Sequence, residues 1–181
     1  MKQLIFVISM LSLMTFLGCD SNSTEMQSSN TEKINQNDKE SNMEKQSKAT
    51  MDVAMKFMDS MGKGDMETMV SLMHEDMVWQ NSGDPNVPWI GPWKGKKTIL
   101  EDFMPKFGAG FKTIKWEPND GFASGDTAAF FGQMIGELTN SNQKTKEFTY
   151  ALRVKVKDGK VLLWNWFEDS FEVSRAYHNR K

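Results

Sequence analysis

The spacing of apolar residues changes once along the chain, at Phe111, and this change limits the folds open to it. Before Phe111, apolar residues recur at helical spacing over 53–61, 66–73 and 99–107. After it, alternation with a period of two predicts strands over 111–117, 128–138, 147–157 and 160–171. Asp158-Gly159, between the last two, is typical of a hairpin turn. This order predicts an α+β domain in which N-terminal helices pack on a strongly curved antiparallel sheet.

Shorter elements complete the expected domain. A strand is predicted over 77–80, and a loop with three prolines and two tryptophans follows over 82–95. A last helix is expected over 173–178. Helices on one face of a bent sheet leave a pocket between the layers, so we expect a cone-shaped half-barrel with an internal pocket.

The first residues have the layout of an export signal. Residues 4–17 are almost entirely apolar, with Lys2 before them and Gly18-Cys19 after them. The segment 15–19 resembles a bacterial lipobox, in which the cysteine is acylated and becomes the mature N-terminus. The alternative is an ordinary signal peptide that is cleaved near a cysteine. We therefore expect an exported protein anchored to a bacterial membrane, inner or outer, by a lipid on Cys19, its single cysteine.

These features divide the chain into three parts: a signal peptide over 1–18, an acylated cysteine and tether over 19–48, and a folded domain over 49–181. The tether has no aromatic residue and few large apolar ones. Such a composition cannot bury enough surface to offset its conformational entropy, which predicts a disordered spacer.

Composition argues against several classes of function. The 22 basic and 24 acidic side chains leave a net charge of −2, which gives no reason to expect nucleic acid as a partner. One cysteine excludes an internal disulfide, and two histidines, His74 and His178, form no cluster for zinc. The sequence therefore implies no metal and no cofactor.

Several short motifs occur in a recognisable order. They are the Gly64-Asp65 turn, residues 76–80 leading into Gly83-Asp84-Pro85, the Val87-Pro88-Trp89 segment, and the ending 158–169. Together they resemble the SnoaL-like group of the nuclear transport factor 2-like superfamily, over about 49–181. This superfamily includes polyketide cyclases, ketosteroid isomerases and limonene epoxide hydrolases. The resemblance implies the cone-shaped fold and leaves the function open, because one fold hosts many activities.

The resemblance to ketosteroid isomerases implies positions for three catalytic groups. The base falls on Asn81, the oxyanion-hole tyrosine on Phe57, and the oxyanion-hole aspartate on Ala151 or Leu152. An amide is no base at neutral pH, and a phenyl ring donates no hydrogen bond. This chain therefore lacks that catalytic set.

The other two activities give a similar result. At the positions of a limonene epoxide hydrolase, Asn81 is retained, while Trp79, Trp166, Gln133 and Ile135 replace the other catalytic residues. The cyclases use an aspartate near the end of the last strand as acid and base. Asp169 or Glu168 lies close to that position, although capping of the last helix would also explain Asp169.

The same comparison implies the lining of the internal pocket. We expect it to be aromatic and largely apolar, formed by Met58, Met61, Trp79, Asn81, Gln133, Ile135, Glu137, Phe148, Tyr150, Trp164, Trp166 and Glu168. Trp89 and Trp93 lie either at its mouth or packed under their loop. Glu137 and Glu168 are its two carboxylates, and burial beside tryptophans would raise their pKa; the alternative is that both face solvent.

Three hypotheses for function follow. The leading one is a lipid-anchored domain that binds a small apolar or aromatic molecule without the catalytic sets of its relatives. The second is an enzyme of the isomerase, cyclase or lyase type that uses Glu168 or Glu137 as acid or base, with Asp169 as a further candidate. The third is a dimeric interaction module of the cell envelope, which an exposed apolar patch on the strands would favour.

Overall fold

The computed structural model describes residues 24–179, with side chains from Lys39 onward. The chain divides into two compact units, 1–38 and 39–181. Helix α1 (Thr24–Lys63) contributes to both. The expected signal peptide and Cys19 lie outside the described residues, so the structure does not bear on them.

Helix α1 extends into the segment expected to be a tether. Residues 39–49 are exposed apart from half-buried Ser47, as a spacer would be, yet they are helical. Between Asp20 and Met61 the chain has no glycine or proline, and it is rich in Glu, Lys and Gln, which favour helix. A composition too polar to bury much surface therefore does not prevent an exposed helix where helix breakers are absent.

The folded domain begins with contacts between α1 and the far end of a hairpin. The Thr50 hydroxyl donates to the Gly125 carbonyl at 2.8 Å, and the Gly125 N–H donates to the Ser47 hydroxyl at 2.9 Å. Gly125 has a φ of 56°, a conformation that suits glycine in this turn. These bonds hold the hairpin against α1.

After α1 ends at Lys63, the chain turns into a short helix and two strands. The Asp65 carboxylate caps α2 (Met66–Ser71) by accepting from the Thr68 N–H. Strand β1 (Met73–Asn81) is longer than expected. Strand β2 (Gly91–Lys94) pairs with it antiparallel, within the segment expected to be a loop.

The third helical segment is continuous but irregular. It comprises α3 (Lys96–Thr98), the π-helical turn η1 (Ile99–Phe103) and α4 (Met104–Gly110). Pro105 lies inside this continuous segment, just after the π-helical turn, at a position where a proline lacks the N–H for a helical hydrogen bond. The helix expected over 99–107 is thus confirmed, with a longer C-terminal end.

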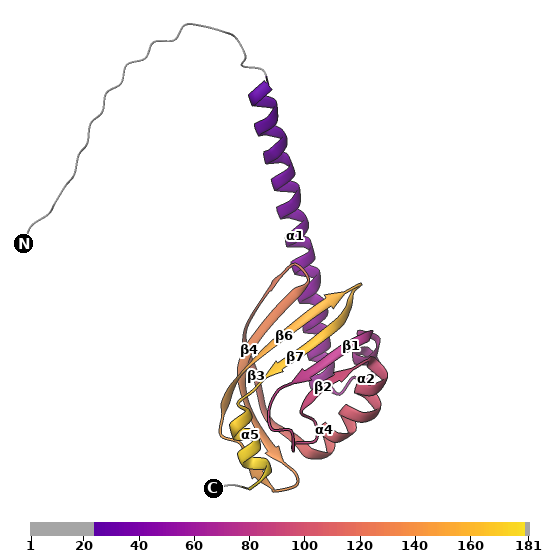
Figure 1. Ribbon diagram of the computed structural model, residues 1–181, viewed down its shortest axis with the longest axis vertical. Helices are drawn as coiled ribbons and strands as arrows, with labels where there is room; N and C mark the ends of the chain where they lie inside the picture. The colour runs from indigo at the N-terminus through magenta and orange to yellow at the C-terminus, as the bar shows by residue number, and fades with distance from the viewer. Residues whose placement is uncertain (1–23, 180–181) are drawn as a thin grey trace, which may run out of the picture. The chain divides into compact units, whose positions relative to one another are not determined.

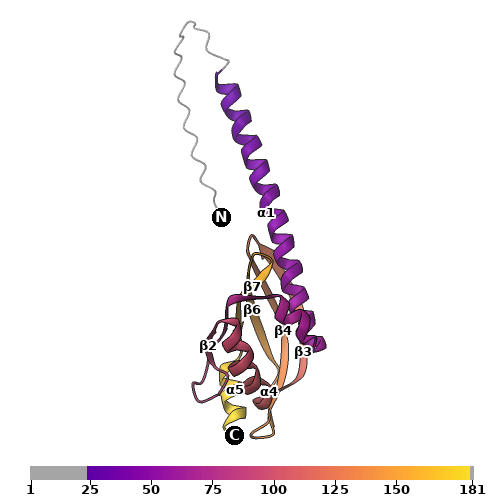
Figure 2. The same cartoon turned by 90° about the vertical axis from the view of Figure 1, so that its right-hand side faces the viewer.

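The remaining strands and the last helix follow as β3 (Phe111–Ser124), β4 (Thr127–Leu138), β5 (Gln143–Lys144), β6 (Phe148–Lys157), β7 (Lys160–Phe167) and α5 (Ser170–Tyr177). The sheet order is β2-β1-β7-β6-β4-β3, with β5 beside β4. β1 and β7 run parallel, so the sheet is mixed, which corrects the expectation of a purely antiparallel one. The α+β class and the strongly curved half-barrel are confirmed; α1 and α4 lie on the same side of the sheet (Figures 1 and 2).

Strand alternation determines which side chains face the helices. In β4 the buried residues are Ala128, Phe130, Gly132, Met134, Gly136 and Leu138, and in β6 they are Phe148, Tyr150, Leu152 and Val154. We call this buried side the inner face and the other the outer face. An aromatic cluster lies on the inner face, with ring centroids 5.0 Å apart for Phe57 and Trp164 and 5.3 Å apart for Trp79 and Trp164.

Candidate functional site

The expected internal pocket is filled by the side chains that were to line it. Trp79, Trp164 and Trp166 are buried, and neither of the two pockets described below is lined by any of them. The Trp79 indole N–H donates to the Asn81 side-chain oxygen at 3.1 Å. The Asn81 amide is therefore hydrogen-bonded to another core residue. These large rings pack against one another across the cone, which leaves them no shared space to line.

Three further residues of the expected lining lie on the outer face. Gln133, Ile135 and Glu137 alternate with buried residues of β4 and are half-buried. The Gln133 amide donates to the Thr149 hydroxyl at 3.1 Å on that face. For Gln133 and Ile135 the expected position inside the cone is wrong, because a shift of one residue in register moves a side chain to the other face of a strand. For Glu137 the outer face agrees with the alternative in which it points away from the pocket.

The Pro-rich segment packs inward. Trp89 is buried, and its ring lies directly over Gly110, where any Cβ would collide with it. The Trp93 indole donates to the Trp89 carbonyl at 3.1 Å. Of the two alternatives for these tryptophans, packing under the loop fits the burial of Trp89.

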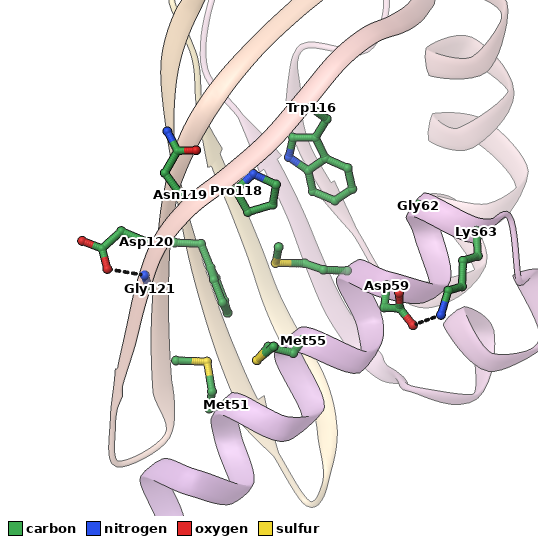
Figure 3. Close-up of a pocket in the computed structure, with 12 residues that line it drawn as sticks. Met51, Met55, Asp59, Gly62, Lys63, Trp116, Pro118, Asn119, Asp120 and Gly121 are labelled. Carbon is green, nitrogen blue, oxygen red and sulfur yellow. Dashed lines mark hydrogen bonds and ion pairs between the residues drawn. The ribbon is translucent and has the colours of Figure 1, made fainter.

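A groove of about 720 Å³ lies between α1 and β3. We call it the α1–β3 groove. Figure 3 shows Met51 and Met55 pointing from α1 toward β3, and Trp116 on the strand facing the helix. Its lining residues are Met51, Met55, Met58, Asp59, Gly62, Lys63, Trp116, Pro118, Asn119, Asp120, Gly121 and Phe130. Of the expected pocket residues, only Met58 lines it; Met61 packs against the core instead.

The charged groups of the groove already have partners. Lys63 forms an ion pair with Asp59 at 2.7 Å, drawn at one end of the groove in Figure 3. The Asp120 carboxylate accepts from the Gly121 N–H at 2.8 Å. Methionine sulfurs and aromatic rings make up most of the remaining wall, and thioether side chains adapt readily to different shapes. The groove is therefore suited to an apolar occupant.

A smaller pocket of about 540 Å³ lies where β7 ends beside β6. We call it the β7 notch. It is lined by Phe131, Glu147, Phe148, Thr149, Tyr150, Ala151, Phe167, Glu168 and Asp169. Thus three of the expected site residues, Phe148, Tyr150 and Glu168, meet here, together with the candidate Asp169.

Glu168 has an unusual environment within the β7 notch. The Trp166 indole donates to its Oε2 at 2.9 Å, while its Oε1 is buried without a hydrogen-bond partner. Burial raises the pKa of Glu168 to about 7; the Trp166 hydrogen bond opposes this and the charge of Asp169 adds to it. Such a carboxyl group can both donate and accept a proton near neutral pH.

Asp169 has a structural role. It is the N-cap of α5, and its carboxylate accepts from the Glu172 N–H at 3.0 Å. Glu137, the other candidate carboxylate, lies on the outer face near the end of β4 and does not line the β7 notch. Of the three candidate acid–base groups, Glu168 and Asp169 therefore line the β7 notch, and Glu137 does not.

Tyr150 connects the two pockets. Its ring stacks on Trp166 with centroids 4.5 Å apart, and its buried hydroxyl has no hydrogen-bond partner. Burial raises the pKa of Tyr150, and the nearby indole of Trp116 opposes that shift. Trp116 lines the α1–β3 groove and Glu168 lines the β7 notch. A buried row of Trp116, Tyr150, Trp166 and Glu168 thus runs between them.

The sequence contains a second helical stripe that predicts the α1–β3 groove, beside the stripe over 53–61 described above. Met51, Met55, Met58 and Gly62 recur at spacings of four, three and four residues. This stripe lies beside the core-facing stripe of Ala54 and Phe57. Two adjacent stripes on one helix indicate two packing surfaces, and the second is the wall of the groove.

Two searches of the described residues gave negative results. Within 24–179, no group of three or more His, Cys, Asp or Glu is placed to hold a metal ion. In the same part of the chain, no helix has the length and apolar character needed to cross a membrane.

Comparison with solved structures finds the same fold in proteins of low identity. A nuclear transport factor 2-like protein from Burkholderia xenovorans superposes with a TM-score of 0.65 at 21% identity, covering 72% of this chain and 97% of that one. An LEH-like epoxide hydrolase from M. tuberculosis gives 0.55 at 15% identity, covering 74% and 92%. A candidate polyketide cyclase from Pseudomonas putida gives 0.58 at 14%, covering 70% and 96%. At these identities the likeness shows the fold alone.

A comparison with curated proteins finds no match. The model of the SnoaL-like domain family matches residues 54–164, which is more than half of the chain and spans α2 to α4, most of the lining of the α1–β3 groove and most of the sheet. The chain therefore belongs to the SnoaL-like domain family.

Proposed function

We propose that this SnoaL-like domain binds a small, largely apolar or aromatic molecule in the α1–β3 groove. The observation that carries the proposal is a groove of about 720 Å³ walled by methionine and aromatic side chains, in which Lys63 is paired with Asp59. Ligand pockets of soluble proteins are commonly about 300–1,000 Å³ and mostly apolar. The domain would act without the catalytic sets of its relatives, since their positions carry Asn81, Phe57 and Trp166 here.

Adaptability of the wall supports this proposal. Met55 is 56% exposed and Met58 only 8% exposed, so the methionines on this helix face range from solvent-exposed to buried. A ligand entering there would cover apolar surface that water now contacts, which favours binding by about 25 cal/mol per Å² of apolar area covered.

The test is a calorimetric titration with 2-acetylnaphthalene, a small aromatic ketone. Met55→Lys places an ammonium group in the groove and is expected to weaken binding at least roughly tenfold, because the charge would lose hydration on ligand entry. Met66→Lys is the matched control, since Met66 is equally exposed but lies outside the groove. No binding by the wild-type protein, or equal weakening in both variants, would refute the proposal.

The proposed setting is extracytoplasmic. The apolar leader and Cys19 favour export and attachment to a bacterial membrane through an N-terminal lipid. Mass spectrometry of the mature N-terminus from the native membrane tests this: a diacylglyceryl Cys19 supports it, and an unmodified N-terminus elsewhere contradicts it.

A second candidate function, acid–base catalysis, rests on Glu168. Its pKa of about 7 and its unpartnered Oε1 at the β7 notch suit proton transfer. Glu168→Gln should then abolish turnover of an epoxide or ketone substrate found by screening, while Glu137→Gln on the outer face should leave it intact. Unchanged turnover in Glu168→Gln would reject this candidate.

A further inference from the structure

Three thioether groups line the α1–β3 groove from a single helix. Met51, Met55 and Met58 are separated by four and three residues, so they project from the same face of α1. All three line the groove, and Figure 3 shows Met51 and Met55 directed into it. Unbranched methionine side chains can rotate toward one another without moving the backbone.

Two oxygen donors of the groove already have partners. Asp59 is held by Lys63 at 2.7 Å and Asp120 accepts from the Gly121 N–H at 2.8 Å, and the lining contains no histidine or cysteine. Hard cations prefer carboxylate and carbonyl oxygens, whereas thioethers select soft ions such as Cu(I). The three thioethers are therefore the donors of this groove that favour a soft ion.

Charge and aromatic rings at the groove are compatible with a monovalent cation. The lining contains two carboxylates, Asp59 and Asp120, and one ammonium, Lys63, which gives a net charge of −1. Trp116 and Phe130 supply aromatic faces beside the methionines, and such faces attract cations.

We propose that the α1–β3 groove is a binding site for a soft monovalent cation, Cu(I) or its analogue Ag(I), held by the thioethers of Met51, Met55 and Met58. This goes beyond the proposed function: it uses the same groove but does not depend on an apolar ligand. If the methionines served only as apolar wall, leucine would replace them with little loss.

Silver titration of the full chain tests the site. All proteins carry Cys19→Ser, because a thiol would bind the same ion. The triple variant Met51→Leu, Met55→Leu, Met58→Leu is expected to lose one Ag(I) equivalent. The control variant Met43→Leu, Met66→Leu removes two exposed methionines outside the groove and should bind Ag(I) like the parent.

Methyl NMR of the parent protein, labelled at the methionine methyl carbons, makes the result independent of how the variants fold. Ag(I) should shift the signals of Met51, Met55 and Met58 first, before those of Met43 and Met66. Unchanged Ag(I) binding in the triple leucine variant, no binding by the parent, or shifts that begin outside the groove would each overturn the proposal. Absence of 2-acetylnaphthalene binding by the parent protein would count against the proposed function and not against the cation site.

Discussion

Glu168 places a carboxyl group with a free, buried oxygen at the end of β7. Its pKa is raised from 4.5 to about 7, chiefly by burial. The folded state therefore binds the proton more tightly than the unfolded state does. The stability that this proton supplies is fully present below pH 4.5 and is lost as pH rises through about 7.

Glu168→Gln should remove this dependence, since an amide stays neutral. Between pH 5 and pH 8, the free energy of unfolding of the wild-type protein is expected to fall by up to about 3 kcal/mol. The variant should not show this fall. Urea unfolding at both pH values measures it. Glu137→Gln, on the outer face, serves as control, and an identical pH dependence in wild type and Glu168→Gln would contradict the burial of this carboxyl group.

Gly132 makes room for the Tyr150 hydroxyl. A Cβ on Gly132 would lie 2.7 Å from that oxygen and would also meet the Glu117 carbonyl. Gly132→Ala should therefore cost about 1–3 kcal/mol in free energy of unfolding. In Gly108→Ala nothing lies within 4 Å of the new Cβ, and the helix should gain about 0.5–1 kcal/mol. A Gly132→Ala protein as stable as wild type in urea would show that Tyr150 is not held there.

At the scale of elements, Asp84 connects the segment after β1 to α5. Its Oδ2 accepts from the Ser174 hydroxyl at 2.6 Å and lies 2.9 Å from His178 Nε2, and the Asn86 N–H donates to Oδ1 at 2.9 Å. The Ser174 bond, then the Asn86 and His178 bonds, hold the pKa of Asp84 well below its usual 3.8. The ionised carboxylate thus fastens α5 to the loop.

Stability supplied by this contact is present above pH 3.8 and is lost as the pH falls below it. Asp84→Asn should lower Tm at pH 7 and weaken the fall of Tm on acidification, as measured by circular dichroism from pH 7 to pH 3. Asp158→Asn, at the β6–β7 turn, is the control because asparagine tolerates its φ of 51°. Equal acid sensitivity in wild type and Asp84→Asn would exclude the contact as its source.

The elements that could be predicted from the sequence are those with a strong local pattern. The helices predicted over 53–61 and 99–107, both longer in the structure, and the hairpin at Asp158-Gly159 each follow from periodicity or turn chemistry. Strand β2 could not be predicted, because Gly91 and Pro92 weaken its pattern and its pairing with β1 brings together residues distant in sequence. The parallel pairing of β1 with β7 likewise joins segments distant in sequence, and no local pattern predicts it.

At the scale of the whole molecule, the sheet's outer face carries exposed aromatic side chains. Phe122, Phe131 and Phe167 are 60%, 38% and 50% exposed, and Phe122 and Phe131 stack with centroids 6.3 Å apart. Lys115 bonds Glu147 at 2.7 Å and contacts Glu117 at 2.9 Å on the same face, so both signs of charge lie beside the patch. A patch that is apolar with mixed charge can pair with a second copy of itself about a two-fold axis.

We expect the protein to form such a homodimer. Phe131→Glu should convert it to a monomer in sedimentation equilibrium, because a buried carboxylate would face its copy across the axis. Phe171→Glu changes an exposed phenylalanine on α5 and should leave the dimer intact. A wild-type monomer at high concentration would refute the expectation.

The candidate site was harder to predict than the fold. Counting along motifs assigned Phe148, Tyr150 and Glu168 to the internal pocket, whereas they line the β7 notch, and it placed Trp79, Trp164 and Trp166 around a cavity that they fill. Sequence spacing predicts which face of the sheet a side chain lies on only where the strand register is continuous. Whether the side chains on that face line a cavity or fill it depends on their summed volume. That volume is a property of the whole cone and not of any one segment.

The position at which an apolar molecule binds is measured directly in a crystal of the protein soaked in 1-bromonaphthalene. Anomalous scattering locates the bromine atom without bias. We predict a peak in the α1–β3 groove, in contact with Met55 and Trp116. A peak between Trp79 and Trp164, a peak confined to the β7 notch, or no peak at saturating ligand would contradict the account.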